Sequence, residues 1–179
     1  MKLVRMPIIE NKVVGRKVIT KNELRKKVKT NKILIDVNAF SEIMKYFISK
    51  GREEAACLLR GKIAGEYLVI WDIHKCEDSK GTAATVRINP VEFTKANKDD
   101  GYYVVGWAHS HPGYTVFMSG TDRDTQLSMQ GLFPDAVAMV MDPFHKDGVQ
   151  FGFFRAEGRR VKEIDFAYLV ERWKHQGTL

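Results

Sequence analysis

Cysteines and long apolar segments are scarce in this 179-residue chain. The two cysteines, Cys57 and Cys76, are too few for a disulfide framework and too far apart for a paired-cysteine metal or redox motif, so we expect free thiols. No apolar run approaches the roughly 20 residues that a membrane-spanning helix needs. The opening residues, MKLVRMPIIENKVV, lack the uninterrupted apolar stretch and the cleavage site of a secretory signal. These absences predict a soluble, cytoplasmic protein with no place in a membrane.

Acidic residues are scarce only at the N-terminus. Residues 1–30 hold ten Lys or Arg against Glu10 and Glu23, a net charge of +8, whereas the whole chain carries +7. This basic segment contains no aromatic residue that could stack on a base. We therefore favour a solvated or partner-docking extension over nucleic-acid binding. The rest, residues 31–179, has the length and composition of one globular domain.

Hydrophobic patterning predicts interleaved strands and helices. Strands are expected at 32–35, in a hairpin over 53–76, and at 102–111, 135–143 and 149–156, with an edge strand possible within residues 1–20. Helices are expected after Asp36 as far as Gly51, briefly after Asn89, and over 119–133, while residues 161–177 add a last strand or a C-terminal helix. This order predicts a single-domain α/β (α+β) fold in which helices cover a sheet.

The stretch GWAHSHPGYTVFMSGTD, residues 106–122, concentrates residues that could bind a metal. Alternate side chains of a strand share a face, so His109 and His111 should point the same way. A helix that begins near Ser119 would carry Asp122 in its first turn. Two histidines and one carboxylate form the three-residue ligand set of a catalytic zinc site.

Each part of this stretch also has a purely structural explanation. Histidines at a strand end are often simply hydrogen-bonded, and Ser119 with Asp122 is close to a helix capping box. Trp107, on the same strand, is expected in the core, whereas Phe117 and Met118 precede the helix and could be exposed. The fixed spacing of histidines and aspartate together favours the metal site.

The spacing resembles the signature of the JAMM (MPN+) metalloprotease family. The matching residues are His109, Ser110, His111, Pro112, Ser119 and Asp122, and an upstream family motif is matched at Glu54, Leu58 and Gly61, with Cys57 where the family usually has glycine. The segments GWAHSHPG, MSGTD, Thr125-Gln126 and VAMVMDP are most similar to the proteasome-lid deubiquitinase branch.

The resemblance implies an MPN-type curved mixed β-sheet flanked by helices, with residues 31–179 as the catalytic domain. It implies Zn²⁺ bound by His109, His111 and Asp122. Glu54 would be the general acid-base and Ser119 would donate a hydrogen bond to the oxyanion; both are therefore implied catalytic residues.

The implied enzyme is an isopeptidase that removes ubiquitin or a ubiquitin-like modifier from conjugated lysines. Its implied partners are such conjugates and, as a candidate assembly, the proteasome. Residues 75–90 could supply a sheet edge for the modifier's tail or could be a surface loop. A non-catalytic MPN scaffold, a peptidase for a sulfur-carrier protein and a DNA-repair-associated relative are the alternatives. A zinc nucleoside deaminase is disfavoured because its paired cysteine ligands are absent.

Overall fold

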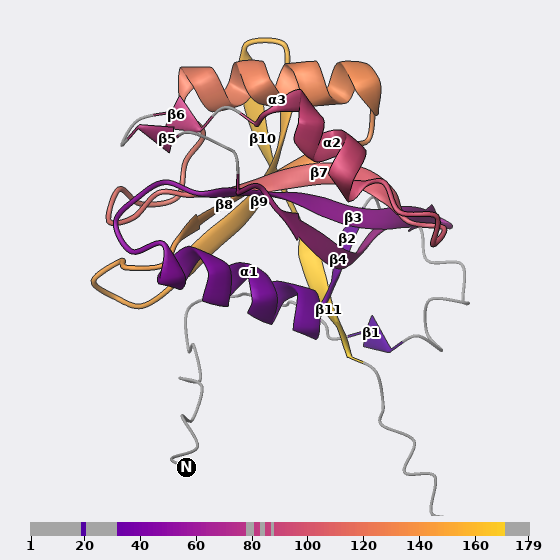
Figure 1. The fold of residues 1–179 in the computed structure, drawn as a ribbon, viewed down its shortest axis with the longest axis horizontal. Coiled ribbons are helices and arrows are strands. Elements are labelled where there is room, and N and C mark those ends of the chain that lie inside the picture. The colour runs from indigo at the N-terminus through magenta and orange to yellow at the C-terminus, as the bar shows by residue number, and fades with distance from the viewer. Residues whose placement is uncertain (1–18, 21–31, 78–80, 83–84, 87, 171–179) are drawn as a thin grey trace, which may run out of the picture.

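The computed structural model describes residues 19–20, 32–77, 81–82, 85–86 and 88–170 (Figure 1). Nine of its strands form one mixed sheet in the order β1-β11-β2-β4-β3-β7-β8-β9-β10. Their bounds are β1 (Ile19–Thr20), β2 (Lys32–Asp36), β3 (Ala56–Ala64), β4 (Tyr67–Lys75), β7 (Tyr103–Ser110), β8 (Val137–Asp142), β9 (Gln150–Glu157), β10 (Arg160–Ile164) and β11 (Phe166–Val170). A separate short hairpin pairs β5 (Gly81–Thr82) with β6 (Thr85–Val86).

Three described helices cover the two faces of this sheet. The helix α1 (Val37–Ser49) lies against one face, and α2 (Pro90–Ala96) and α3 (Gly120–Leu132) lie against the other (Figure 1). Apolar residues of α1 join the larger core cluster, and residues of α2 and α3 join a second cluster on the opposite face. The predicted fold, a curved mixed sheet flanked by helices, is confirmed. None of the helices in the described ranges is long and apolar enough to cross a membrane.

The first helix begins and ends where the sequence predicts. The Asp36 carboxylate accepts hydrogen bonds from the backbone N–H groups of Asn38 (2.8 Å) and Ala39 (3.3 Å), which satisfies donors that the helix itself leaves free. Gly51, with φ of +64°, takes the left-handed conformation just beyond the helix. The predicted short helix behind Asn89 is confirmed as α2, with the Asn89 side chain as its cap.

The strands β7 and β8 are parallel neighbours joined by α3, so their carboxyl ends lie at the same edge of the sheet. The two strands approach closely at Gly106, where an added Cβ would lie 2.1 Å from the Val137 carbonyl oxygen. Glycine is therefore required at Gly106 if His109 is to keep its register opposite Val140. This pairing fixes the end of β7, from which the two histidines project.

The C-terminal part of the sheet differs from the prediction. Residues 161–177 were expected to give one last strand or a helix, but the chain forms two strands, β10 and β11, on either side of Asp165. The exposed β10 pairs with β9 at one edge, whereas the apolar β11 crosses to lie between β1 and β2. The two strands differ in burial, since β10 is exposed and β11 is largely buried, and no turn signal in the sequence marks the boundary between them. Residues 171–177 lie outside the described residues, and β1 confirms the expected edge strand within residues 1–20.

The prediction that Cys57 and Cys76 form no disulfide is confirmed, and both thiols are buried. Burial raises the pKa of Cys76 to about 12 and that of Cys57 well above its ordinary value. Neither thiol is therefore a nucleophile at neutral pH.

Candidate metal centre

The two histidines converge at the carboxyl end of β7, as their spacing predicts. His109 lies in the strand and His111 just beyond it, and their Nε2 atoms are 3.1 Å apart. The backbone N–H of His111 donates to the Met141 carbonyl of β8 (2.8 Å), so the position of His111 remains fixed by the sheet after the strand ends. Both imidazoles are buried.

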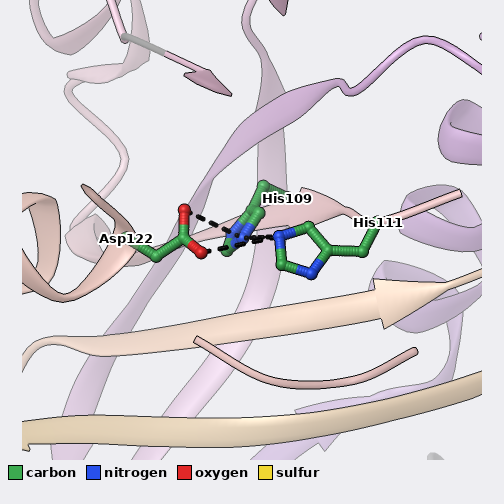
Figure 2. A group of neighbouring side chains, drawn as sticks. All are labelled: His109, His111 and Asp122. Carbon is green, nitrogen blue, oxygen red and sulfur yellow. Dashed lines mark hydrogen bonds and ion pairs between the residues drawn. The ribbon is translucent and has the colours of Figure 1, made fainter. Parts of the chain in front are cut away.

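Asp122 completes the group from the first turn of α3. Its Oδ1 lies 3.4 Å from Nε2 of His109 and its Oδ2 lies 3.5 Å from Nε2 of His111 (Figure 2). The capping box is present as well: Ser119 Oγ accepts from the N–H of Asp122 (3.2 Å), and Asp122 Oδ2 accepts from the N–H of Ser119 (2.7 Å). Both interpretations of the sequence are therefore correct for Asp122: its carboxylate caps the helix and also faces the two histidines.

The charge state of this group favours a cation. Burial alone would raise the pKa of Asp122, but hydrogen bonds to the two histidines outweigh it and hold that pKa well below its usual range. Burial lowers the pKa of His109 despite the opposing effect of Asp122. At neutral pH, a carboxylate and an uncharged imidazole of His109 thus present lone pairs to the same small volume.

The distances suit zinc. Donors that bind at the 2.0–2.1 Å typical of tetrahedral zinc lie about 3.3 Å apart. Here the two histidine Nε2 atoms are 3.1 Å apart, and each faces a different oxygen of Asp122, at 3.4 Å and 3.5 Å. One ligand atom from each of His109, His111 and Asp122 can be chosen so that the three lie within 4.8 Å of one another. We conclude that these residues fit a zinc ion.

Glu54, the expected acid-base, lies beside this group in the connection between α1 and β3. Burial raises the pKa of Glu54, His111 lowers it and Asp122 raises it again, so the carboxylate senses both predicted ligands. Its neighbour Ala55 is held to the histidine strand, since Ala55 N–H donates to Ser110 Oγ (3.0 Å) and Ser110 N–H donates to the Ala55 carbonyl (3.0 Å). Ser110 thus locates Glu54 next to the histidines, a role that the sequence did not predict.

The structure explains which side chains two positions of the upstream motif can accept. Cys57, at the position usually held by glycine, is fully buried in the core, and β3 continues through it with partners Lys75 and Ala108. An added Cβ at Gly61 would lie 1.8 Å from the Val69 carbonyl oxygen, so glycine is required there. The side chain at Cys57 is therefore compatible with the strand that follows Glu54.

The loop after His111 is held by Asp142, at the end of β8. This fully buried carboxylate accepts hydrogen bonds from the N–H groups of Gly113 (2.8 Å), Thr115 (3.0 Å) and Phe144 (3.0 Å). Thr115 has a φ of +69°, a conformation costly for a β-branched residue. Asp142 therefore compensates for backbone strain beside the candidate site, a role that the sequence segment VAMVMDP did not reveal.

Aromatic side chains surround the histidines. Trp107 is 1% exposed, which confirms its predicted place in the core. Phe117 is exposed as expected, with its ring 4.8 Å from that of His111. Met118, which could have been exposed, is half-buried instead and packs against the core cluster below α3.

Comparison with known proteins gives the family. The family described as JAB1/Mov34/MPN/PAD-1 ubiquitin protease matches residues 28–135, which include the whole candidate site. The chain belongs to this family, which confirms the resemblance to JAMM (MPN+) proteins. The likeness to the proteasome-lid branch stays a prediction.

Several relatives share about a third of the aligned residues. Subunit 5 of the COP9 signalosome complex from Oryza sativa subsp. japonica is 33% identical over 125 residues, 64% of this chain and 35% of that protein. The AMSH-like protease of Mus musculus is 31% identical over 111 residues, 62% of this chain and 25% of that protein. Subunit 5a of the same complex from Arabidopsis thaliana is 30% identical over 145 residues, 74% of this chain and 40% of that protein. The chain thus spans well under half the length of these relatives.

A solved structure supports the fold. The solution structure of a protein from Desulfitobacterium hafniense matches with a TM-score of 0.65 at 19% identity, over 82% of this chain and 99% of that one.

Proposed function

We propose that this protein is a zinc-dependent isopeptidase that removes ubiquitin or a ubiquitin-like modifier from conjugated lysines. The observation that carries the proposal is the convergence of His109, His111 and Asp122 on one buried volume at zinc-like distances, with Glu54 beside them. Membership of a family described as ubiquitin proteases, and a relative described as a protease, support the class of reaction.

In this proposal, His109, His111 and Asp122 hold the ion. A bound zinc ion lowers the pKa of a coordinated water to about 7 and polarises the carbonyl of the bond to be cleaved. Glu54 accepts the proton of the attacking water and donates it to the leaving lysine amine, for which its raised pKa is suited. The Ser119 hydroxyl uses its oxygen for the helix cap and keeps its proton free to donate to the developing oxyanion.

The modifier's extended tail would bind along a sheet edge. The hairpin of β5 and β6 lies within the segment that we expect to supply this edge, and strand addition gives affinity through the main chain. Deleting residues 79–86 should weaken cleavage of a folded modifier. Unchanged cleavage by that deletion variant would remove the hypothesis.

The organisation of the chain is part of the proposal. We assign residues 31–179 to the catalytic domain and residues 1–30 to a basic extension, either solvated or docked on a partner, with the proteasome as a candidate assembly. The family match, which starts at residue 28, supports this boundary. A cytoplasmic location stays a prediction.

The test combines zinc content with cleavage of isopeptide-linked conjugates by the full chain. Wild type should hold one zinc ion and cleave ubiquitin or ubiquitin-like conjugates, and sulfur-carrier conjugates are assayed beside them. Glu54→Gln should retain zinc and lose about 10²- to 10⁴-fold in rate. The matched control is Glu53→Gln, because Glu53 is the adjacent carboxylate and is exposed; this variant should keep both properties.

The alternatives predict different results. A chain that holds no zinc when the metal is supplied would be a non-catalytic scaffold, in disagreement with its complete ligand set. Zinc-bound wild type that cleaves only sulfur-carrier conjugates would be a peptidase of that class. Equal losses in Glu54→Gln and Glu53→Gln would reject Glu54 as the acid-base.

A further inference from the structure

Trp107 and Gln126 face each other across the gap that separates the proposed zinc ligands. Trp107 precedes His109 by two residues on β7, and Gln126 follows Asp122 by four residues on α3. Both spacings place the two residues on the same face of their element. The contact between Trp107 and Gln126 therefore runs alongside the contact between His109 and Asp122, and both connect the same strand to the same helix.

The contact between Trp107 and Gln126 is well formed and fully buried. Trp107 Nε1 donates a hydrogen bond to Gln126 Oε1 (2.9 Å). The indole also stacks on the His109 ring, with centroids 4.4 Å apart and planes 11° from parallel. Trp107 and His109 are 1% exposed and Gln126 is not exposed at all. One side chain of the strand thus touches both the helix and a proposed ligand.

The orientation of the Gln126 amide is determined by its other partners. Its Nε2 donates to the Ala136 carbonyl (2.7 Å) and to Gln130 Oε1 (2.9 Å), so Oε1 must face the tryptophan. Ala136 directly precedes β8. Gln126 therefore connects α3 to both strands that support the candidate site.

The stacking contact with Trp107 matters for the orientation of the His109 ring, because Nδ1 of that ring does not orient it through a hydrogen bond. A metal-bound histidine is usually oriented by a hydrogen bond from the nitrogen that does not bind the metal. In the part of the chain that the structure describes, the buried Nδ1 of His109 has no hydrogen-bond partner. Its ring plane is therefore fixed by the flat indole surface of Trp107, which is fixed in turn by Gln126.

We propose that Trp107 and Gln126 are positioning residues for the metal centre: together they orient the His109 ring and set the distance between the histidine strand and the helix that carries Asp122. This inference rests on the proposed zinc site. It assigns a role to Gln126, which the resemblance to JAMM proteins had left without one.

The test measures metal binding by the full chain, through zinc affinity by competition with a chromogenic chelator and the visible spectrum of bound Co²⁺. Trp107→Phe keeps an aromatic ring and loses the donor, and Gln126→Met keeps the length and loses the acceptor. Each should weaken zinc binding about 10-fold and shift the Co²⁺ bands. The double variant should be no weaker than the more affected single variant, because both remove one shared contact.

The control is Gln130→Met. Gln130 continues the same hydrogen-bonded chain to Ala156, whereas the indole N–H of Trp107 donates to Gln126. This variant should lower the unfolding midpoint while its zinc affinity stays within about twofold of wild type, since the contact with the tryptophan persists. Equal zinc affinity in Gln126→Met, Trp107→Phe and Gln130→Met would overturn this inference alone. A wild-type chain that binds neither zinc nor Co²⁺ would overturn the proposed function together with it.

Discussion

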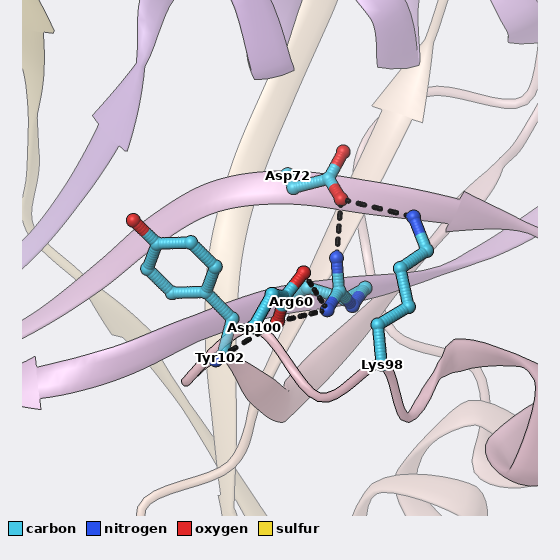
Figure 3. A network of polar contacts seen from close by, with 5 residues as sticks. All are labelled: Arg60, Asp72, Lys98, Asp100 and Tyr102. Carbon is cyan, nitrogen blue, oxygen red and sulfur yellow. Dashed lines mark hydrogen bonds and ion pairs between the residues drawn. The ribbon is translucent and has the colours of Figure 1, made fainter.

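The buried guanidinium of Arg60 and the buried carboxylate of Asp122 differ in how their charges are compensated. The fully buried guanidinium of Arg60 on β3 hydrogen-bonds to Asp72 through Nη1 and to both oxygens of Asp100 through Nη2, each at 2.7 Å (Figure 3). Lys98 lies 3.6 Å from Asp72, so two cations, Arg60 and Lys98, balance the two carboxylates. The four charges cancel within the group.

The candidate metal centre lacks this internal balance. Within the described residues, the ion-pair partners of Asp122 are His109 and His111, and burial disfavours the charged form of His109. Among the described residues, Asp122 therefore has no Lys or Arg partner. The comparison shows that a buried charge does not by itself identify a binding site. A buried charge without a full set of opposite charges is the better indication, because a bound ligand would supply the missing charge.

The largest expected effect comes from removing a proposed ligand. His109→Ala should lose bound zinc and about 10³-fold or more in cleavage rate, since several kcal/mol of transition-state stabilisation depend on the ion. Arg60→Met should keep both zinc and activity. Zinc content and initial rates, measured in parallel, check the contrast. Residual cleavage above a tenth of wild type in His109→Ala would count against the site.

Added zinc should also change the stability of the Arg60 and His109 variants by different amounts. At a free concentration 100 times the dissociation constant, the ion should stabilise wild type by about 2.7 kcal/mol, or roughly 5–10 °C in Tm. Arg60→Met should show the same increment and His109→Ala none. Thermal scans with and without zinc, after treatment with a chelator, measure it. An equal increment in all three proteins would mean that zinc binds elsewhere.

Arg60→Met should lower the free energy of unfolding by about 2 kcal/mol. Breaking a buried ion pair costs more than this, but Asp72 and Asp100 are 43% and 39% exposed and solvent screens them. Urea unfolding of the zinc-free proteins gives the value. A change below about 0.5 kcal/mol would show that the network is no more than a surface contact.

The smallest effect concerns pH. The hydrogen bond from Arg60 lowers the pKa of Asp100 below its ordinary value. A carboxyl group with a lowered folded-state pKa contributes stability above its unfolded pKa of about 3.9, and loses it as the pH falls through the folded-state value. The difference in urea midpoint between wild type and Arg60→Met should therefore shrink from pH 7 to pH 3. A difference that grows at pH 3 would contradict this sign.

Local sequence signals predicted the parts of the site that depend on local geometry. The two-residue period of a strand brings His109 and His111 together, and the first turn of a helix places Asp122 near its cap. These relations need only the chain's own periodicity. The helix after Asp36 was predictable for the same reason, since its cap lies within three residues of the donors that it satisfies.

The supports of the site depend on pairings between distant residues and were not predictable in this way. Ser110 binds Ala55 across 55 positions, and Asp142 binds Gly113 across 29. Nothing in either segment's periodicity specifies its partner, because the register between strands is set only when the sheet forms. The division of β10 from β11 escaped prediction for the same reason.

The double contact of Asp122 bears on how such a centre can arise and be lost. A serine and an aspartate at a helix start already stabilise a fold with no chemistry, so a third of the ligand set can exist before any metal is bound. Two substitutions at the end of one adjoining strand, one in it and one just beyond it, then complete the set. In the reverse direction, a relative that loses its histidines still has a structural reason to keep the aspartate, so an aspartate at this helix start does not by itself indicate a metal site, whereas the histidine pair does.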